Sequence, residues 1–188
     1  MIYPIYVYGT SVLRKKAQEI PKDYEGLEQL VEDMFETMTV SEGVGLAAPQ
    51  IGKSLRVFVV DTTQIEYNEE EDDEDISDFK QAFINPEIIE ETGEEWTSNE
   101  GCLSIPGIRE DVERKERLRI QYYDPQFNFH DEVYEGIKAR IIQHEYDHLM
   151  GVLFVDKINP LRKRLIKGKL NAISKGKVDT TYKIKISK

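Results

Sequence analysis

The feature that most restricts the fold is the pair of histidines at the two ends of the segment H-E-Y-D-H, residues 144–148. Histidines four residues apart lie one above the other on one face of a helix, so both imidazoles can reach a single metal ion. Apolar residues recur at helical spacing around this segment, which predicts a helix from Tyr134 to Met150, with Gly151 ending it. Its apolar residues are Ile137, Ile141, Ile142, Tyr146 and Leu149. Burying two histidines beside two carboxylates is costly unless these side chains bind a partner such as a metal ion. The fold therefore has to bury this helix with room for an ion beside it.

The pattern H-E-x-x-H is short, and on its own it arises by chance about as often as it marks a metal site. Where it marks one, Glu145 lies beside the ion and can take a proton from metal-bound water. Neither histidine nor glutamate follows His148, so the third ligand is Asp156, Asp179 or a residue upstream. The upstream candidate is Cys102, whose thiolate is a strong ligand for zinc or ferrous iron. A Cys-His-His set leaves a fourth position open for water, as catalytic sites do.

Cys102 is the only cysteine of the chain, so an intrachain disulfide is excluded. A lone cysteine in a reducing compartment is either a small buried hydrophobe or a functional thiol. The buried hydrophobe is the more common of the two, and the residue alone leaves both readings open.

Charge is distributed unevenly along the 188 residues. The whole chain carries −11, yet residues 156–188 hold eleven Lys/Arg against two Asp/Glu, a local charge of +9. The total argues against non-specific binding of duplex nucleic acid, and the simplest reading of the basic end is a solvated helix face. Residues 69–75 are all acidic and predict a mobile surface loop; a calcium site is the alternative, although the turn glycine of an EF-hand loop is missing. We find neither a membrane-spanning run nor a signal peptide, which predicts a single domain over residues 1–188 in the cytoplasm, without membrane or sequence-specific nucleic-acid partners.

Periodicity and turn residues predict the remaining elements. A helix over residues 27–38 ends near Ser41 and Gly43, and a loop rich in Gly covers residues 43–52. Strands are predicted at 55–60, 83–89, 117–123 and 182–186, with turns at Gly93 and Asp124-Pro125 and a hairpin tip at 128–131. A basic amphipathic helix over residues 160–173 follows Asn159, a residue suited to cap it.

Three segments, G-V-G-L-A-A-P-Q-I-G (43–52), E-G-C-L-S (100–104) and Q-H-E-Y-D-H-L-M-G (143–151), resemble in order and spacing the three signature motifs of peptide deformylase. The resemblance implies an α+β fold, with antiparallel β-sheets packed around a central helix that carries the H-E-x-x-H motif, a C-terminal helix and a short terminal strand. Against a minimal member of the family, residues 62–81 are an acidic loop insertion and residues 160–188 a basic C-terminal helix and strand.

The implied enzyme takes part in protein biosynthesis: it removes the formyl group from the N-terminal formylmethionine of new polypeptides and releases formate. The family usually works with Fe²⁺, while Zn²⁺, Ni²⁺ or Co²⁺ can occupy the site in purified protein. Cys102, His144 and His148 would hold the metal, and metal-bound hydroxide would attack the formyl carbon with Glu145 as general acid and base. The Gln50 side chain and the backbone N–H of Leu103 would stabilise the developing oxyanion.

The resemblance also suggests substrate contacts. Gly45 would let a peptide pair with the backbone, and Arg109 would contact the peptide main chain. An apolar pocket for the methionine side chain would be lined by Val44, Ile137 and Ile141; ordinary core packing is the alternative for all three. For Gln50 the alternative is a loop residue that holds neighbouring backbone. Asp147 is expected to fix a nearby arginine or histidine and not to bind the metal.

The sequence is also compatible with two other functions. A general metallopeptidase or amidase would cleave other amide bonds. A non-catalytic structural zinc module would need a fourth protein ligand, for which the only remaining histidine is His130. The basic C-terminal segment further suggests a transient contact with the ribosome, where substrate emerges.

Overall fold

The structure is a computed structural model that describes residues 1–65 and 76–187. Its helices and strands, in chain order, are β1 (Ile5–Tyr6), α1 (Leu27–Val40), β2 (Gly45–Ala47), β3 (Val57–Asp61), β4 (Lys80–Gly101), β5 (Arg109–Tyr123), β6 (Phe129–Glu135), α2 (Gly136–Leu149), α3 (Pro160–Ser174) and β7 (Ile184–Lys185). The acidic run 69–75, with its predicted loop, lies outside the described residues. Within them, no helix is long and apolar enough to cross a membrane.

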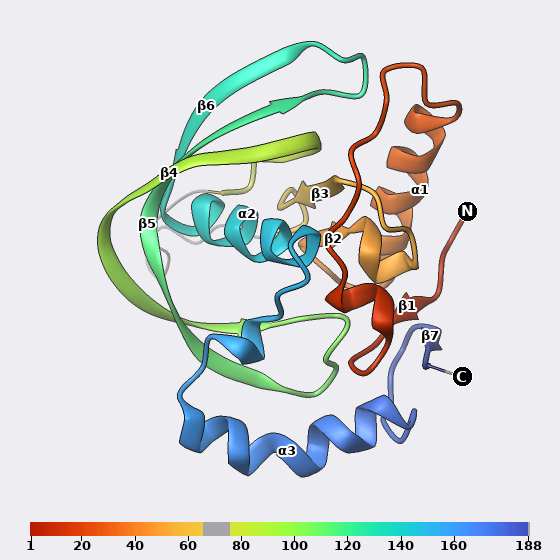
Figure 1. The fold of residues 1–188 in the computed structure, drawn as a ribbon, viewed down its shortest axis with the longest axis vertical. Coiled ribbons are helices and arrows are strands. Elements are labelled where there is room, and N and C mark those ends of the chain that lie inside the picture. The colour runs from red at the N-terminus through yellow and green to blue at the C-terminus, as the bar shows by residue number, and fades with distance from the viewer. Residues whose placement is uncertain (66–75, 188) are drawn as a thin grey trace.

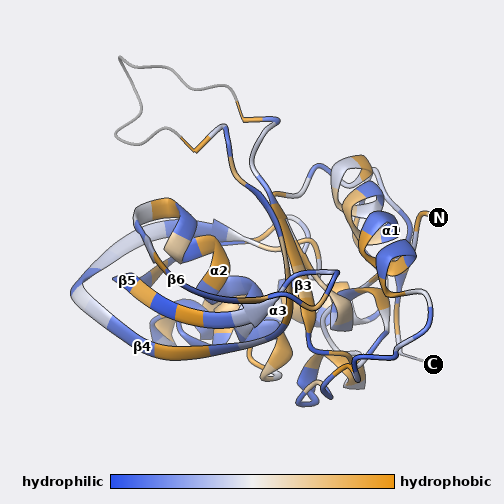
Figure 2. Cartoon of the chain, turned by 90° about the horizontal axis from the view of Figure 1, so that it is seen from above, coloured by the Kyte–Doolittle hydropathy of each residue, from blue (hydrophilic) through white to orange (hydrophobic). Residues whose placement is uncertain are grey.

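Five strands form one antiparallel sheet in the order β2-β3-β4-β5-β6, so the predicted mixture of helices and antiparallel sheet is confirmed. The long strands β4 and β5 curve around one side of α2 (Figure 1), and α2 also packs on β2, β3 and β6. The apolar residues of α1 pack on β2 and β3. Figure 2 shows α1 on the side of the molecule that bears the chain termini, with apolar and polar residues on different faces of the helix. A second, two-stranded sheet pairs β1 with β7; this pair is parallel, in contrast to the antiparallel sheets that were predicted.

The strand prediction is wrong at Gly93. Residues 83–89 do not end at a turn there: β4 continues through to Gly101, paired with β5 for almost its whole length. Three register shifts absorb the irregularity, between Ile84 and Glu87, between Ile88 and Glu90, and between Thr92 and Glu95. Gly93 takes a φ of +82° within the third. A glycine inside a strand marks a bulge as well as a turn, and local sequence does not separate the two.

Three further boundaries differ from the prediction. The segment 43–52 is not only a loop: it holds β2, paired with β3, and a 3₁₀ turn over Ala48–Ile51. The hairpin turn lies at residues 124–128, where the Asp124 carboxylate accepts hydrogen bonds from the backbone N–H groups of Gln126 and Asn128. His130, predicted at the hairpin tip, lies in β6 and stacks on Tyr122. Tyr134 lies in β6, and α2 therefore begins at Gly136, two residues later than predicted.

The C-terminal helix agrees with its prediction. The Asn159 side chain caps α3 by accepting a hydrogen bond from the backbone N–H of Leu161. The face of α3 that bears Ile166, Leu170 and Ile173 is buried in an apolar cluster with Leu13 and Phe154. The other face carries the basic residues toward solvent.

Candidate active site

Three donor side chains converge between α2 and the end of β4. His144 and His148 come from adjacent turns of α2, and Cys102 follows β4 directly. The Sγ atom of Cys102 lies 3.3 Å from Nε2 of His148, and the donor atoms of all three residues lie within 4.8 Å of one another. Among the described residues, no other group of three potential ligands meets this criterion. Asp156 instead pairs with Arg14 and Lys163, so Cys102 is the candidate that joins the two histidines.

The chemistry of this donor set fits a divalent metal. One thiolate and two imidazoles suit zinc or ferrous iron, and three protein ligands leave room for a fourth from water or substrate. Nδ1 of His148 and Oε2 of Glu145 are buried without a hydrogen-bond partner among the described residues. Buried polar atoms are rarely left so, and water bound to an ion at this site would give Oε2 of Glu145 the partner that it lacks. Nδ1 of His148 is the ring nitrogen opposite Nε2, which faces Cys102, so the ion would not be its partner.

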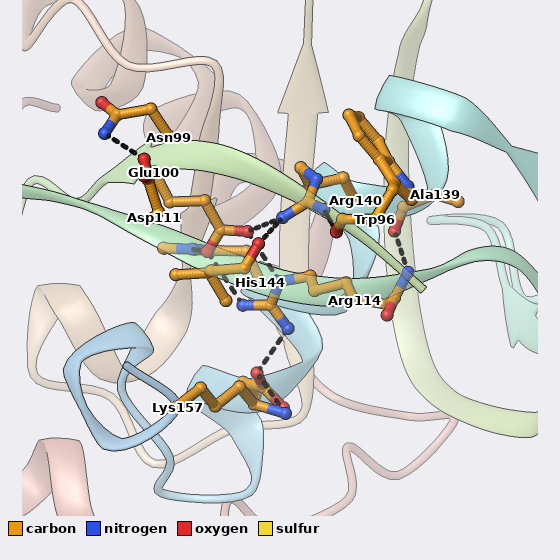
Figure 3. Close-up of polar contacts among 12 residues, drawn as sticks. Trp96, Asn99, Glu100, Asp111, Arg114, Ala139, Arg140, His144 and Lys157 are labelled. Carbon is orange, nitrogen blue, oxygen red and sulfur yellow. Dashed lines mark hydrogen bonds and ion pairs between the residues drawn. The ribbon is translucent and has the colours of Figure 1, made fainter. Parts of the chain in front are cut away.

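A network of buried charges surrounds Glu100 and orients His144 (Figure 3). Glu100 accepts hydrogen bonds from Nε and Nη2 of Arg114 at 2.6 and 3.0 Å and from Nη1 of Arg140 at 3.1 Å. It also lies 3.2 Å from Nδ1 of His144. This contact fixes Nδ1 as the donor nitrogen, which leaves Nε2 of His144 free to face Cys102. Asp147 binds Arg114 at 2.8 Å, so its expected role beside an arginine is confirmed.

Glu100, Arg114 and Arg140 were not predicted as site residues from the sequence. Glu100 lies inside a recognised motif, so its position next to Cys102 was a usable signal. Arg114 and Arg140 come from β5 and α2, far from Glu100 in sequence, and only the tertiary fold brings them to it.

Burial and charge together set the ionisation of this cluster. Burial alone would raise the pKa of Glu100, but hydrogen bonds from His144 and Arg114 prevail and lower that pKa to about 2. Burial would likewise lower the pKa of His144, yet hydrogen bonds to Cys102 and Glu100 raise it well above its usual value. Burial and the positive charge of His144 lower the pKa of His148. Burial raises the pKa of Glu145 to about 7, the range in which a carboxyl group can both take up and release a proton.

Gly45 packs directly against Glu145. A Cβ built on Gly45 would collide with Oε1 of Glu145 and lie 2.7 Å from its Cδ and 2.8 Å from its Cγ. The backbone φ of Gly45 is not in the left-handed region, so space and not conformation demands glycine here. Gly45 was predicted to contact substrate; in the structure it also leaves the space that the Glu145 carboxylate occupies.

Gln50 connects β2 with the Cys102 segment. Its Oε1 accepts a hydrogen bond from the backbone N–H of Ala47 at 2.8 Å, which turns Nε2 toward the site. Nε2 lies 3.2 Å from Oγ of Ser104 and 3.5 Å from Sγ of Cys102. Gln50 thus holds neighbouring backbone with one end, as one reading of the sequence expected, and presents a donor beside Cys102 with the other.

A cleft of about 700 Å³ opens over these groups. Its walls include all five predicted substrate-binding residues, namely Val44, Gly45, Arg109, Ile137 and Ile141, and also Gln50, Cys102, Leu103, His144 and Glu145. Arg109 is oriented by hydrogen bonds to the side chain and backbone of Asn99 at 2.8 and 3.0 Å. A further wall, residues 179–182 near the C-terminus, was not predicted, because nothing in the local sequence connects it to the motifs.

Known proteins resemble the chain throughout its length. A family model described as polypeptide deformylase matches residues 2–164. A peptide deformylase of Christiangramia forsetii is 52% identical, with the match covering 98% of this chain and 96% of that protein.

Solved structures agree. The peptide deformylase of Thermus thermophilus superposes with a TM-score of 0.82 at 38% identity, covering 94% of this chain and 99% of that one. A Met-Ala-Ser-bound class I type b peptide deformylase of Acinetobacter baumannii superposes with a TM-score of 0.74 at 35% identity, covering 84% of this chain and 99% of that one. The chain therefore belongs to the polypeptide deformylase family.

Proposed function

We propose that this protein removes the N-formyl group from the formylmethionine at the start of newly made polypeptides and releases formate. One observation carries the proposal: Cys102, His144 and His148 converge beside the buried carboxyl of Glu145, at the base of a cleft in a chain of the deformylase family. We further propose that residues 1–188 form one catalytic domain, with 62–81 as an insertion, and that it works in the cytoplasm.

Cys102, His144 and His148 would hold one divalent metal ion, Fe²⁺ in the native enzyme and Zn²⁺, Ni²⁺ or Co²⁺ as alternatives. When bound, the ion would make a water molecule more acidic and polarise the formyl carbonyl. The Glu100 contact at Nδ1 would keep His144 turned toward the ion, since a partner on the far nitrogen fixes the imidazole of a metal-binding histidine.

Glu145 would move the protons of the reaction. It takes a proton from the attacking water onto its carboxylate and then delivers that proton to the departing amine nitrogen. Gly45 supports the role by leaving room for the carboxylate.

The tetrahedral oxygen would accept hydrogen bonds from Nε2 of Gln50 and from the backbone N–H of Leu103. The bond from Ala47 to Oε1 supports this assignment, because it leaves Nε2 as the end of Gln50 that faces the cleft. Donors held in place before the reaction stabilise developing charge without reorganising, and losing one typically costs about 10²–10³ in rate.

The substrate would enter as an extended peptide. Val44, Ile137 and Ile141 would enclose the methionine side chain, and Arg109 would bind the peptide main chain, held ready by Asn99. Gly45, at the start of the edge strand β2, would pair with the peptide as an added strand. The Met-Ala-Ser-bound relative supports a tripeptide of this composition as the test ligand.

Matched peptides separate this function from a general amidase or metallopeptidase. We expect metal-loaded protein to release formate from formyl-Met-Ala-Ser and to leave both acetyl-Met-Ala-Ser and Met-Ala-Ser intact. Equal turnover of the acetylated peptide, or cleavage of an internal bond, would favour the general amidase. Stable metal binding without turnover of any peptide would favour the structural zinc module.

The exposed face of α3 supports a transient ribosome contact. Arg164, Lys167 and Lys169 are exposed there, whereas Arg162 is engaged with Glu110 at 2.8 and 2.9 Å. Deleting residues 160–188 is a poor test, because the deletion would remove buried core residues of α3 and the β7 partner of β1.

Replacing Arg164, Lys167 and Lys169 with glutamine keeps the fold and removes the charge. We expect this variant to co-sediment less with ribosomes, while a control with Lys15, Lys16 and Lys22 replaced by glutamine, also exposed, co-sediments as the wild type does. Equal co-sedimentation of all three proteins would rule the contact out.

A further inference from the structure

The tail that follows α3, residues 175–187, returns from the far end of α3 to the N-terminal part of the molecule (Figure 1). The backbone N–H groups of Ile5 and Val7 donate hydrogen bonds to the carbonyls of Lys183 and Lys185 at 2.8 and 3.0 Å. On its way the tail passes the cleft, which residues 179–182 help to line. This placement lies beyond residues 2–164, the part that the family model matches.

One tail residue reaches into the active-site segment. The hydroxyl of Tyr182 donates a hydrogen bond to the backbone carbonyl of Leu103 at 2.8 Å. The ring of Tyr182 is half-buried and packs with Leu103 against the apolar cluster that contains Leu46 and Met38. Burial and the nearby Cys102 raise the pKa of Tyr182 to about 12, so the hydroxyl keeps its proton at neutral pH and acts as a fixed donor.

The hydrogen bond completes the bracing of the segment from Cys102 to Ile105. The N–H of Ile105 closes a turn onto the carbonyl of Cys102 at 2.9 Å. The Ser104 carbonyl accepts from the N–H of Tyr8 at 2.8 Å, and the Ser104 hydroxyl contacts Gln50. Leu103 is the residue between these anchors, and Tyr182 binds its carbonyl. The Leu103 N–H shares its peptide plane with the Cys102 carbonyl, which Ile105 holds, and the Leu103 carbonyl lies in the next plane, which Tyr182 holds. The two hydrogen bonds therefore limit rotation on both sides of the Leu103 Cα, and a rotation there would turn the N–H that is proposed to bind the oxyanion.

We propose that Tyr182 is a positioning residue for catalysis, which holds Leu103 so that its backbone N–H stays aimed at the oxyanion. This inference rests on the proposed deformylase function and on the role of Leu103 within it. Tyr182 does not touch the reacting atoms; it acts through the Leu103 main chain. The C-terminal tail therefore supports the active site through Tyr182, in addition to pairing with β1.

Tyr182→Phe tests the inference, because it removes the hydroxyl and keeps the packed ring. The matched control is Tyr3→Phe: Tyr3 packs against the same apolar cluster and donates to Asp33 at 3.4 Å, away from the cleft. Both variants, loaded with the same metal, are compared with the wild type for kcat and KM on formyl-Met-Ala-Ser, for melting temperature, and for hydrogen exchange at the Leu103 amide.

We expect Tyr182→Phe to lower kcat about two- to tenfold, the range that one neutral hydrogen bond supplies, with KM nearly unchanged. The Leu103 amide should exchange faster in this variant only, and Tyr3→Phe should keep the wild-type kcat. A Tyr182→Phe enzyme with wild-type kcat and only a lower melting temperature would overturn the inference, as would an equal loss of kcat in Tyr3→Phe. A wild type that leaves the formyl peptide intact would instead refute the deformylase function, and the role of Tyr182 with it.

Discussion

Gly45→Ala would displace the Glu145 carboxylate without altering any ionisable group. The new Cβ would lie 2.7 Å from Cδ of Glu145, whereas ordinary contacts begin at 3.4 Å, so one of the two must give way. Because Gly45 is fixed in β2 by its pairing with Val60, the Glu145 side chain is the part that moves, by about 0.7 Å. A displacement of this size at a catalytic group costs about 10- to 100-fold in rate, or about 1.4 to 2.7 kcal/mol in activation free energy.

Steady-state kinetics on formyl-Met-Ala-Ser separate this effect from a substrate contact. We expect Gly45→Ala to lose kcat and to keep its metal, because no ligand is touched. A larger KM with unchanged kcat would mean that Gly45 serves only peptide approach, and kcat within threefold of the wild type would refute the packing argument. Gly168→Ala is the matched control: nothing lies within 4 Å of a Cβ at Gly168, and alanine there should stabilise α3 by about 0.5–1 kcal/mol with kcat unchanged.

Two further predictions concern ion pairs. Glu100→Gln removes the carboxylate that Arg114 and Arg140 share; Arg114 keeps its pair with Asp147, but the Arg140 charge stays buried without its carboxylate. We expect a loss of about 3–5 kcal/mol in unfolding free energy, measured by denaturation. Metal affinity should fall about 10- to 100-fold in a metal titration, and wild-type values for both quantities would contradict the role of Glu100. Burial alone would raise the pKa of Asp61, but hydrogen bonds from Thr63 and Lys80 lower it below the usual 3.8. The ionised Asp61 therefore stabilises the folded protein fully above pH 3.8, and this contribution is lost as pH falls through the lowered pKa. Asp61→Asn should therefore unfold about 1–3 kcal/mol more easily at pH 7 and approach wild-type stability in acid; a gap that stays constant with pH would refute this.

The parts of the site that were predictable from sequence depend on residues close to one another in the chain. The spacing of His144 and His148 places them on one helical face, and the absence of a downstream histidine or glutamate directs attention to Cys102. The apolar stripe of α1 and the Asn159 cap of α3 were predictable for the same reason.

What the sequence left open depends on long-range packing. Arg114 and Arg140 meet Glu100 only after β5 and α2 have assembled, and an arginine on a strand gives no sign of such a partner. Gly93 was misjudged because a bulge and a turn use the same residue. Tyr182 alternates with its neighbours like any short strand, and its contact with Leu103 follows from the path of the tail.

In the proposed reaction, a metal on Cys102, His144 and His148 works with Glu145 to hydrolyse the formyl amide. The decisive experiment compares the wild type with Glu145→Gln, both purified without oxygen, for bound metal and for formate released from formyl-Met-Ala-Ser. We predict about one metal ion per chain in both proteins, since Glu145 is not a ligand, with formate released by the wild type alone. A Glu145→Gln protein that releases formate at the wild-type rate would show that Glu145 does not move the protons of the reaction.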